Sequence, residues 1–253
     1  MANRSYLFAI SHPPASHDDR PLTVSGLSEW AYELPFLYRL LASGDPRLCA
    51  SLISDTLDGA AVPLHAIASP FEPGLARVQR FADIVKTLPG AQPPPPPPTS
   101  VLGKIKSLFG PAEPTGDAAR ALGDRLDDML AFLRAHRDRY VLLETLELDV
   151  MAEGEPQALK ARVEDEIERC RQAGAALDAL PADIDQAARV LQAATTHKGE
   201  APLDAFFSLR LDRACDGTPA RMADYSLGMY WSDVLYYDLA GGQPDEAGQG
   251  VPG

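Results

Sequence analysis

Three acidic side chains that lie close together in the sequence are the first candidates for chemistry or recognition. Glu144, Glu147 and Asp149 fall within one short segment that is otherwise rich in apolar residues. Paired carboxylates can act as general acid and base when burial separates their pKa values. The same groups can instead form an acidic recognition edge, because Asp and Glu side chains are mostly exposed. The pattern favours a partner-binding edge and leaves open an enzyme, a hydrolase or transferase, with a Glu144 and Glu147 carboxylate site.

The remaining chemistry-bearing residues form no recognised motif. His12 and His17 lie beside Asp18 and Asp19 in a proline-rich loop, but their spacing is not a known ligand pattern. The three cysteines are far apart and include no C-x-x-C pair, which argues against a zinc site and a disulfide framework. The chain also lacks the nucleophile-elbow, dinucleotide, phosphate-loop and H-E-x-x-H motifs. We therefore predict no catalytic residue, no metal and no cofactor.

Aromatic side chains are the second candidates for partner binding. Trp30, Trp231 and Tyr236 could anchor a protein interface, because aromatic residues supply a large contact area at low entropic cost. Their alternative role is packing in the core.

The elements that must position these groups are short strands and amphipathic helices. Ser5 to Ile10, Tyr140 to Leu148 and the C-terminal aromatic segments are rich in strand-forming residues, and we expect them to form one small sheet. Ser28 is expected to cap a helical turn that carries Trp30. The prediction is an α+β fold, mainly helical, with an antiparallel sheet and helices packed on one of its faces.

Apolar residues at three- and four-residue steps predict four helices. The predicted helices cover Gly74 to Leu88, a segment from Asp117, Pro156 to about Leu180, and Ala182 to Ala194. The third helix offers opposite charges four residues apart, so we expect its charged face to be solvated. The expected ion pairs are Lys160 with Glu164, Arg162 with Glu166, and Asp165 with Arg169.

Proline marks the boundary of an insertion. Six consecutive prolines, Pro93 to Pro98, favour polyproline II and not a packed element. We expect a single composite domain over residues 1–240, interrupted by a surface insertion at about 91–116, and a disordered tail over 241–253. The apolar peptide that follows the prolines, up to Phe109, could serve an adaptor or chaperone as a docking arm over residues 93–109.

Charge restricts the class of partner. The formal net charge is −13, which disfavours nucleic acid because phosphate binding needs clustered Lys and Arg. A basic protein is the natural complement. The sequence contains no apolar run that could span a membrane and no secretory leader pattern, so it predicts a cytoplasmic location.

Four sequence blocks carry a family resemblance: Met1 to Leu7, Leu27 to Trp30 with the nearby Leu34, Pro35 and Tyr38, Arg139 to Glu144, and Trp231 to Tyr237. Together they resemble an uncharacterised family of bacterial cytoplasmic proteins. The resemblance implies an immunity-like role in bacterial competition, in which an acidic protein binds and neutralises a cognate toxin. The predicted function is therefore stoichiometric binding of a basic toxin or effector domain.

Overall fold

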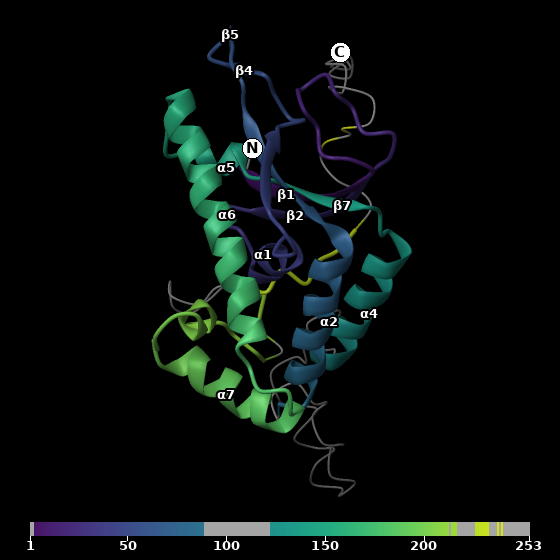
Figure 1. Cartoon of the computed structure of the whole chain (residues 1–253), viewed down its shortest axis with the longest axis vertical. Helices are drawn as coiled ribbons and strands as arrows, with labels where there is room; N and C mark the ends of the chain where they lie inside the picture. The colour runs from purple at the N-terminus through teal and green to yellow at the C-terminus, as the bar shows by residue number, and fades with distance from the viewer. Residues whose placement is uncertain are drawn as a thin grey trace, which may run out of the picture.

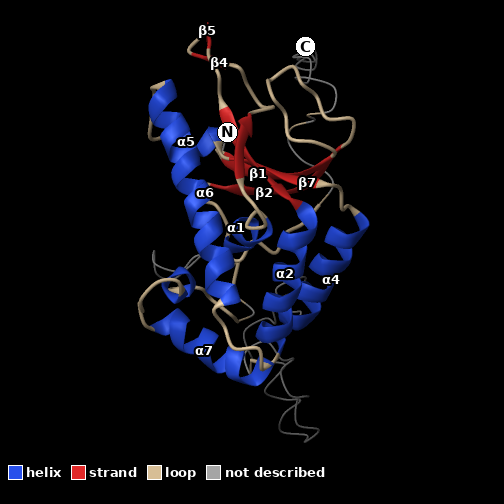
Figure 2. Cartoon of the chain, viewed as in Figure 1, coloured by secondary structure: helices blue, strands red, loops and turns tan. Residues whose placement is uncertain are grey.

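A five-stranded antiparallel sheet with helices below it forms the centre of the protein (Figures 1 and 2). The computed structural model describes residues 3–88, 122–212, 214–216, 226–232, 237 and 239. The expected insertion at about 91–116, which contains the apolar peptide up to Phe109, and the expected tail over 241–253 lie outside these residues. The α+β prediction is confirmed.

The strands do not follow chain order across the sheet. The order is β2-β1-β7-β6-β3, and every neighbouring pair is antiparallel. The strand β7 therefore lies at the centre, although it follows β6 by about seventy positions in the sequence. The strands of the sheet are β1 (Arg4–Ile10), β2 (Val24–Ala31), β3 (Arg47–Ala50), β6 (His65–Pro70) and β7 (Tyr140–Glu144), and a separate hairpin consists of β4 (Thr56–Leu57) and β5 (Ala60–Ala61).

The helices pack mainly on one face of the sheet, as predicted from the sequence (Figure 2). Apolar periodicity correctly indicated most of them, and Asp183 caps the helix that follows it by accepting a bond of 2.8 Å from the backbone N–H of Gln186. The helices are α1 (Phe36–Leu41), α2 (Phe71–Lys86), α4 (Leu122–Ala135), α5 (Leu146–Asp149), α6 (Pro156–Asp178), α7 (Ile184–Thr196) and a 3₁₀ turn (Leu203–Phe206).

The strand β1 is buried on both faces, and its successive side chains point to opposite sides of the sheet. Leu7 and Ala9 join the core beneath the sheet, which is shared with α1, α2, α4 and α6. Tyr6, Phe8 and Ile10 join a second apolar cluster on the opposite face. That second cluster is completed by Leu52, Ile53, Leu64, Leu146 and Leu159.

The predicted helical turn at Ser28 is wrong. Residues Val24–Ala31 form β2, which pairs with β1 along its whole length and carries a bulge opposite Leu7 and Phe8. The hydroxyl of Ser28 does not cap a helix, because it donates a hydrogen bond of 2.5 Å to the backbone oxygen of Tyr230. Pairing with a buried neighbour thus overrides a local capping signal.

The C-terminal aromatic segment does not add a strand within the residues that the structure describes. Residues 226–232 lie against β2 and α1, where the carbonyl oxygens of Ser226 and Leu227 accept hydrogen bonds from the backbone N–H groups of Phe36 and Leu37. Gly228 has φ of 81° and interrupts the extended backbone. These carbonyls satisfy the N-terminus of α1 in place of a regular ladder.

Candidate functional site

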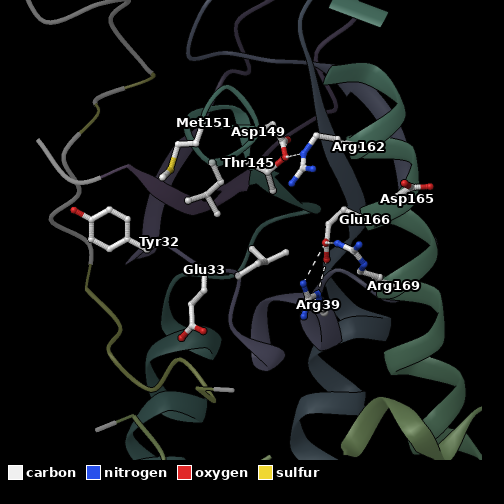
Figure 3. Close-up of a pocket in the computed structure, with 12 residues that line it drawn as sticks. Tyr32, Glu33, Arg39, Thr145, Asp149, Met151, Arg162, Asp165, Glu166 and Arg169 are labelled. Atoms are coloured by element: carbon white, nitrogen blue, oxygen red, sulfur yellow. Dashed lines mark hydrogen bonds and ion pairs between the residues drawn. The ribbon is translucent and has the colours of Figure 1, made fainter. Parts of the chain in front are cut away.

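A pocket of about 340 Å³ lies where the end of β2, α1, α5 and α6 meet (Figure 3). One of its walls is largely apolar and the other is charged. The apolar wall consists of Tyr32, Leu34, Leu148 and Met151, and the polar wall consists of Arg39, Thr145, Asp149, Arg162, Glu166 and Arg169.

The charged wall is built around Glu166, which is 6% exposed. Its two carboxylate oxygens accept bonds from Nε and Nη2 of Arg39, and Oε2 also accepts one from Nη1 of Arg169 at 2.9 Å. The contact between Arg39 and Glu166 is bidentate, which fixes the orientation of both side chains. The carboxylate of Glu166 thereby ties α1 to α6 and holds two guanidinium groups at the pocket.

A second ion pair continues the same wall. Oδ1 of Asp149 accepts a bond of 3.0 Å from Nε of Arg162, and Oδ2 accepts one of 2.7 Å from the hydroxyl of Thr145. Burial raises the pKa of Asp149, and the two hydrogen bonds oppose that rise. The bond from Thr145 fixes the carboxylate, and the carboxylate in turn orients the guanidinium group of Arg162.

Two exposed side chains flank the apolar wall. Tyr32 is 66% exposed and Met151 is 57% exposed. The backbone of Tyr32 has φ of 65°, a left-handed conformation that side chains other than glycine, Asn and Asp rarely adopt, and its N–H donates a bond of 2.9 Å to the oxygen of Asn3. Strain of this kind, roughly 1 kcal/mol or more, concentrates at functional sites.

The ion pairs on α6 differ in part from those expected from the sequence. Lys160 pairs with Glu164 at 3.1 Å, as predicted. Arg162 pairs instead with Asp149, and Glu166 pairs with Arg39 and Arg169. The face that carries Glu166 is not solvated, because this carboxylate is buried between α1 and α6.

The three acids predicted as a recognition edge are separated by the fold. Glu144 is fully buried, and its carboxylate accepts bonds from the N–H of Leu52 at 2.7 Å and the hydroxyl of Ser51 at 2.9 Å. It cannot form part of an exposed rim. Glu144 is the last residue of β7 and is buried there, and the chain then turns into α5, so the three acids do not lie along one strand.

Glu147 and Asp149 both belong to α5, but only Asp149 lines the pocket. The carboxylate of Glu147 accepts bonds of 2.9 Å from the N–H of Arg4 and from the hydroxyl of Tyr6. It fastens the start of β1. Neither Glu144 nor Glu147 lines this pocket, so the pocket does not provide the carboxylate site of the enzyme alternative.

Replacing Glu144 by glutamine should reduce the dependence of stability on pH. Burial raises the pKa of Glu144 from its ordinary value of 4.5 to about 7. The folded protein therefore binds an additional proton between these two values, so this group's contribution to stability is greatest below pH 4.5 and is lost as the pH rises through 7. The full difference corresponds to roughly 3 kcal/mol.

Urea unfolding at several values from pH 5 to pH 8 measures this effect. The wild-type protein should lose more unfolding free energy across the range than the Glu144→Gln variant. Glu200→Gln, which changes an exposed acid, is the matched control and should follow the wild type. Parallel curves for the wild type and Glu144→Gln would contradict the raised pKa of Glu144.

The aromatic candidates are only partly available at the surface. Trp30 is half-buried, donates a bond of 3.0 Å from Nε1 to Glu33 and stacks on Tyr230 with ring centroids 5.7 Å apart. Trp231 is half-buried and packs against the core beside Tyr38. Tyr236 lies outside the described residues. None of these three residues lines the pocket as the described residues define it.

The histidines of the proline-rich loop have structural contacts. His12 contacts Asp19 at 3.2 Å, and Nδ1 of His17 lies 3.1 Å from the backbone oxygen of Ser51. Among the described residues, no group of three His, Cys, Asp or Glu side chains is arranged to hold a metal ion. In the same part of the chain, no helix combines the length and apolar composition needed to cross a membrane.

A larger hollow of about 730 Å³ lies beside the edge strand β3. Its walls include Pro13, Pro14, Leu48 and Val62, so they are largely apolar, and His17 at its rim is already engaged with Ser51 and Arg20. The smaller pocket is lined by three arginines together with their carboxylate partners, whereas the ionisable lining of the hollow includes Asp18, Asp55 and His65, so we take the smaller pocket as the candidate site.

The comparison with protein families assigns only part of the chain. Residues 11–98 match DUF7822, a domain of unknown function. The DUF7822 match includes the Leu27 to Trp30 block of the resemblance and excludes the opening residues. No curated protein and no solved structure matches the chain. Within the pocket, Tyr32 to Arg39 belong to the DUF7822 match, whereas the residues on α5 and α6 lie beyond it.

Glu166 is the residue of this site that helical periodicity could have indicated. Glu166 lies three residues after Val163 and four before Cys170, so it falls on the apolar stripe of α6 and not on the opposite face. A charged residue in that position needs a partner. The partner Arg39 is 127 residues away in the sequence, and no local pattern identifies it.

Proposed function

We propose that this protein binds another protein stoichiometrically, and that it acts as an immunity protein that neutralises a cognate toxin. The observation that carries the proposal is the exposed pair Tyr32 and Met151 beside the ion pairs that line the pocket. Interface hot spots combine large anchoring side chains with an environment that excludes water. Tyr32 presents such a side chain at the surface, on a left-handed backbone.

Two further features support a protein ligand. Met151 has a flexible, polarizable side chain, which suits contact with a partner surface. Val150, next to Met151 in the sequence, is also exposed, at 39%. The net charge of −13 favours rapid encounter with a basic partner, because complementary charge raises association rates.

Affinity purification of the tagged full chain from its own cells tests the proposal. We expect one partner in stoichiometric amount, and we expect its recovery to fall at least about tenfold with the double variant Tyr32→Ala and Met151→Ala, since two anchors are lost. Ile184→Ala removes an exposed apolar side chain elsewhere and is the matched control.

The toxin assignment has its own readout. The recovered partner should arrest growth when it is produced alone, and co-production of the wild-type chain should restore growth. Recovery of a partner that is equally abundant with the double variant would contradict the proposed surface. A partner without any effect on growth would contradict the immunity role.

A further inference from the structure

Three arginines line the pocket, although the chain as a whole is acidic. The guanidinium groups of Arg39, Arg162 and Arg169 face two carboxylates, those of Asp149 and Glu166 (Figure 3). The other two acids of the lining are directed elsewhere. Asp165 points away from the other lining side chains, and Oε1 of Glu33 accepts bonds from Trp30 at 3.0 Å and from Ser226 at 2.6 Å.

The two inward carboxylates are engaged with protein donors. Glu166 accepts three N–H bonds, and each oxygen of Asp149 accepts one bond. The arginines retain donors. Within the described residues, Arg162 uses only Nε and Arg169 only Nη1, and their side chains are 41% and 55% exposed. A guanidinium group has five N–H donors, so both can bind a further acceptor.

The two arginines are also held in position toward the same space. They are seven residues apart on α6, which places them on one face of the helix about two turns apart. Asp149 and Glu166 orient their guanidinium groups before any ligand arrives. Planar, pre-oriented guanidinium groups favour carboxylates, with which they form charge-assisted hydrogen bonds.

We propose that the pocket receives the carboxylate of an aspartate or glutamate side chain of the protein partner. The carboxylate accepts hydrogen bonds from Arg162 and Arg169, and the partner's neighbouring apolar atoms lie against Leu148 and Met151. This inference rests on the proposed function, because it names the partner group that this site recognises. The exposed Tyr32 and Met151 at the pocket favour a side chain that belongs to a protein surface over a small free acid.

An acidic residue at the pocket is compatible with a basic partner. Long-range attraction depends on the summed charge of both molecules, whereas ions in solution screen exposed charges beyond about 8–10 Å. The local pairing at the pocket instead depends on the groups in contact. The site would therefore set the register of the complex, while the overall charge accelerates encounter.

A matched pair of peptides tests the proposal on the full-length protein. N-acetyl-Phe-Glu-amide and N-acetyl-Phe-Gln-amide have nearly the same shape and differ in the carboxylate. Titrations are followed by NMR at the Nε–H groups of the arginines and the methyl group of Met151. We expect the Glu peptide to bind at least about tenfold more tightly, with shifts at Arg162, Arg169 and Met151.

Variants locate the binding. Arg162→Gln and Arg169→Gln should each weaken binding of the Glu peptide and reduce its advantage over the Gln peptide. Arg47→Gln is the control, because Arg47 is an exposed arginine that also pairs with an acid, Asp45. The comparison of the two peptides on the wild-type protein needs no variant to fold.

Three results would overturn the proposal: equal affinity for the two peptides, shifts outside the pocket only, or sodium acetate binding as tightly as the Glu peptide, which would indicate a site for small acids. The proposed function can fail independently of this test. A partner that depends on Tyr32 and Met151 but is retained by both arginine variants would leave the proposed function in place and overturn the carboxylate assignment.

Discussion

Replacing Gly74 by alanine should destabilise the protein by about 4 kcal/mol, at the exceptional end of the effects of single substitutions. Gly74 lies in the first turn of α2, where the helix crosses the end of α1. A Cβ atom at this position would lie 1.7 Å from the carbonyl oxygen of Leu41 and 2.7 Å from its carbonyl carbon. These are backbone atoms, so no side-chain rotation can relieve the clash, and the two helices must separate.

Thermal and urea unfolding of Gly74→Ala measure this effect. Gly154→Ala is the matched control, because a Cβ atom there meets nothing within 4 Å. The control should unfold within about 0.5 kcal/mol of the wild type, as surface substitutions usually do. A loss of less than about 1 kcal/mol at Gly74 would show that α1 and α2 do not approach as closely as described.

The segment that matches DUF7822 should not fold when it is produced alone. Residues 11–98 contain β2 and β6 but lack β1 and β7, which pair with them. In the full chain, β7 joins β1 to β6 at the centre of the sheet. Without these strands, β2 loses its partner and the remaining β3 and β6 form only a two-stranded ribbon, which is at best marginally stable.

Circular dichroism and urea titration distinguish the outcomes. We expect the fragment of residues 11–98 to show no cooperative transition, and we expect the fragment of residues 1–240, which retains both strands, to unfold cooperatively. The second fragment also tests the predicted extent of the composite domain. A cooperative transition of the shorter fragment would show that the matched segment forms a domain without β1 and β7.

Sequence patterns predicted the elements whose burial is regular over several turns. The stripes of α2, α4 and α6 repeat at helical steps, and β1 is continuously apolar because it is buried on both faces. The strands β3 and β6 escaped prediction, since their few, largely small residues have no clear period. The apolar run up to Leu148 predicts a continued strand, but the strand ends at Glu144 and the apolar residues after it suit the single turn of α5 equally well.

The candidate site was less accessible to sequence analysis than the fold. Asp149 is a sequence candidate that lines the pocket, but it pairs with Arg162, thirteen positions away, and no local pattern indicates that contact. Tyr32 is exposed and has a left-handed backbone after β2, and a tyrosine in the sequence indicates neither. Pairings such as Arg39 with Glu166 arise only when α1 and α6 come together.

The position of β7 also has a consequence for how the protein folds as it is synthesised. Tyr6 pairs with Glu144, so the centre of the sheet joins residues 138 positions apart in the chain. Pairings at such long range are slow to form, because the loop must be closed before the contacts stabilise it. During synthesis on the ribosome, the edges of β1 and β6 that pair with β7 stay unpaired until β7 has emerged. Open edges promote association between chains, which makes this interval the period in which chaperone protection would matter most.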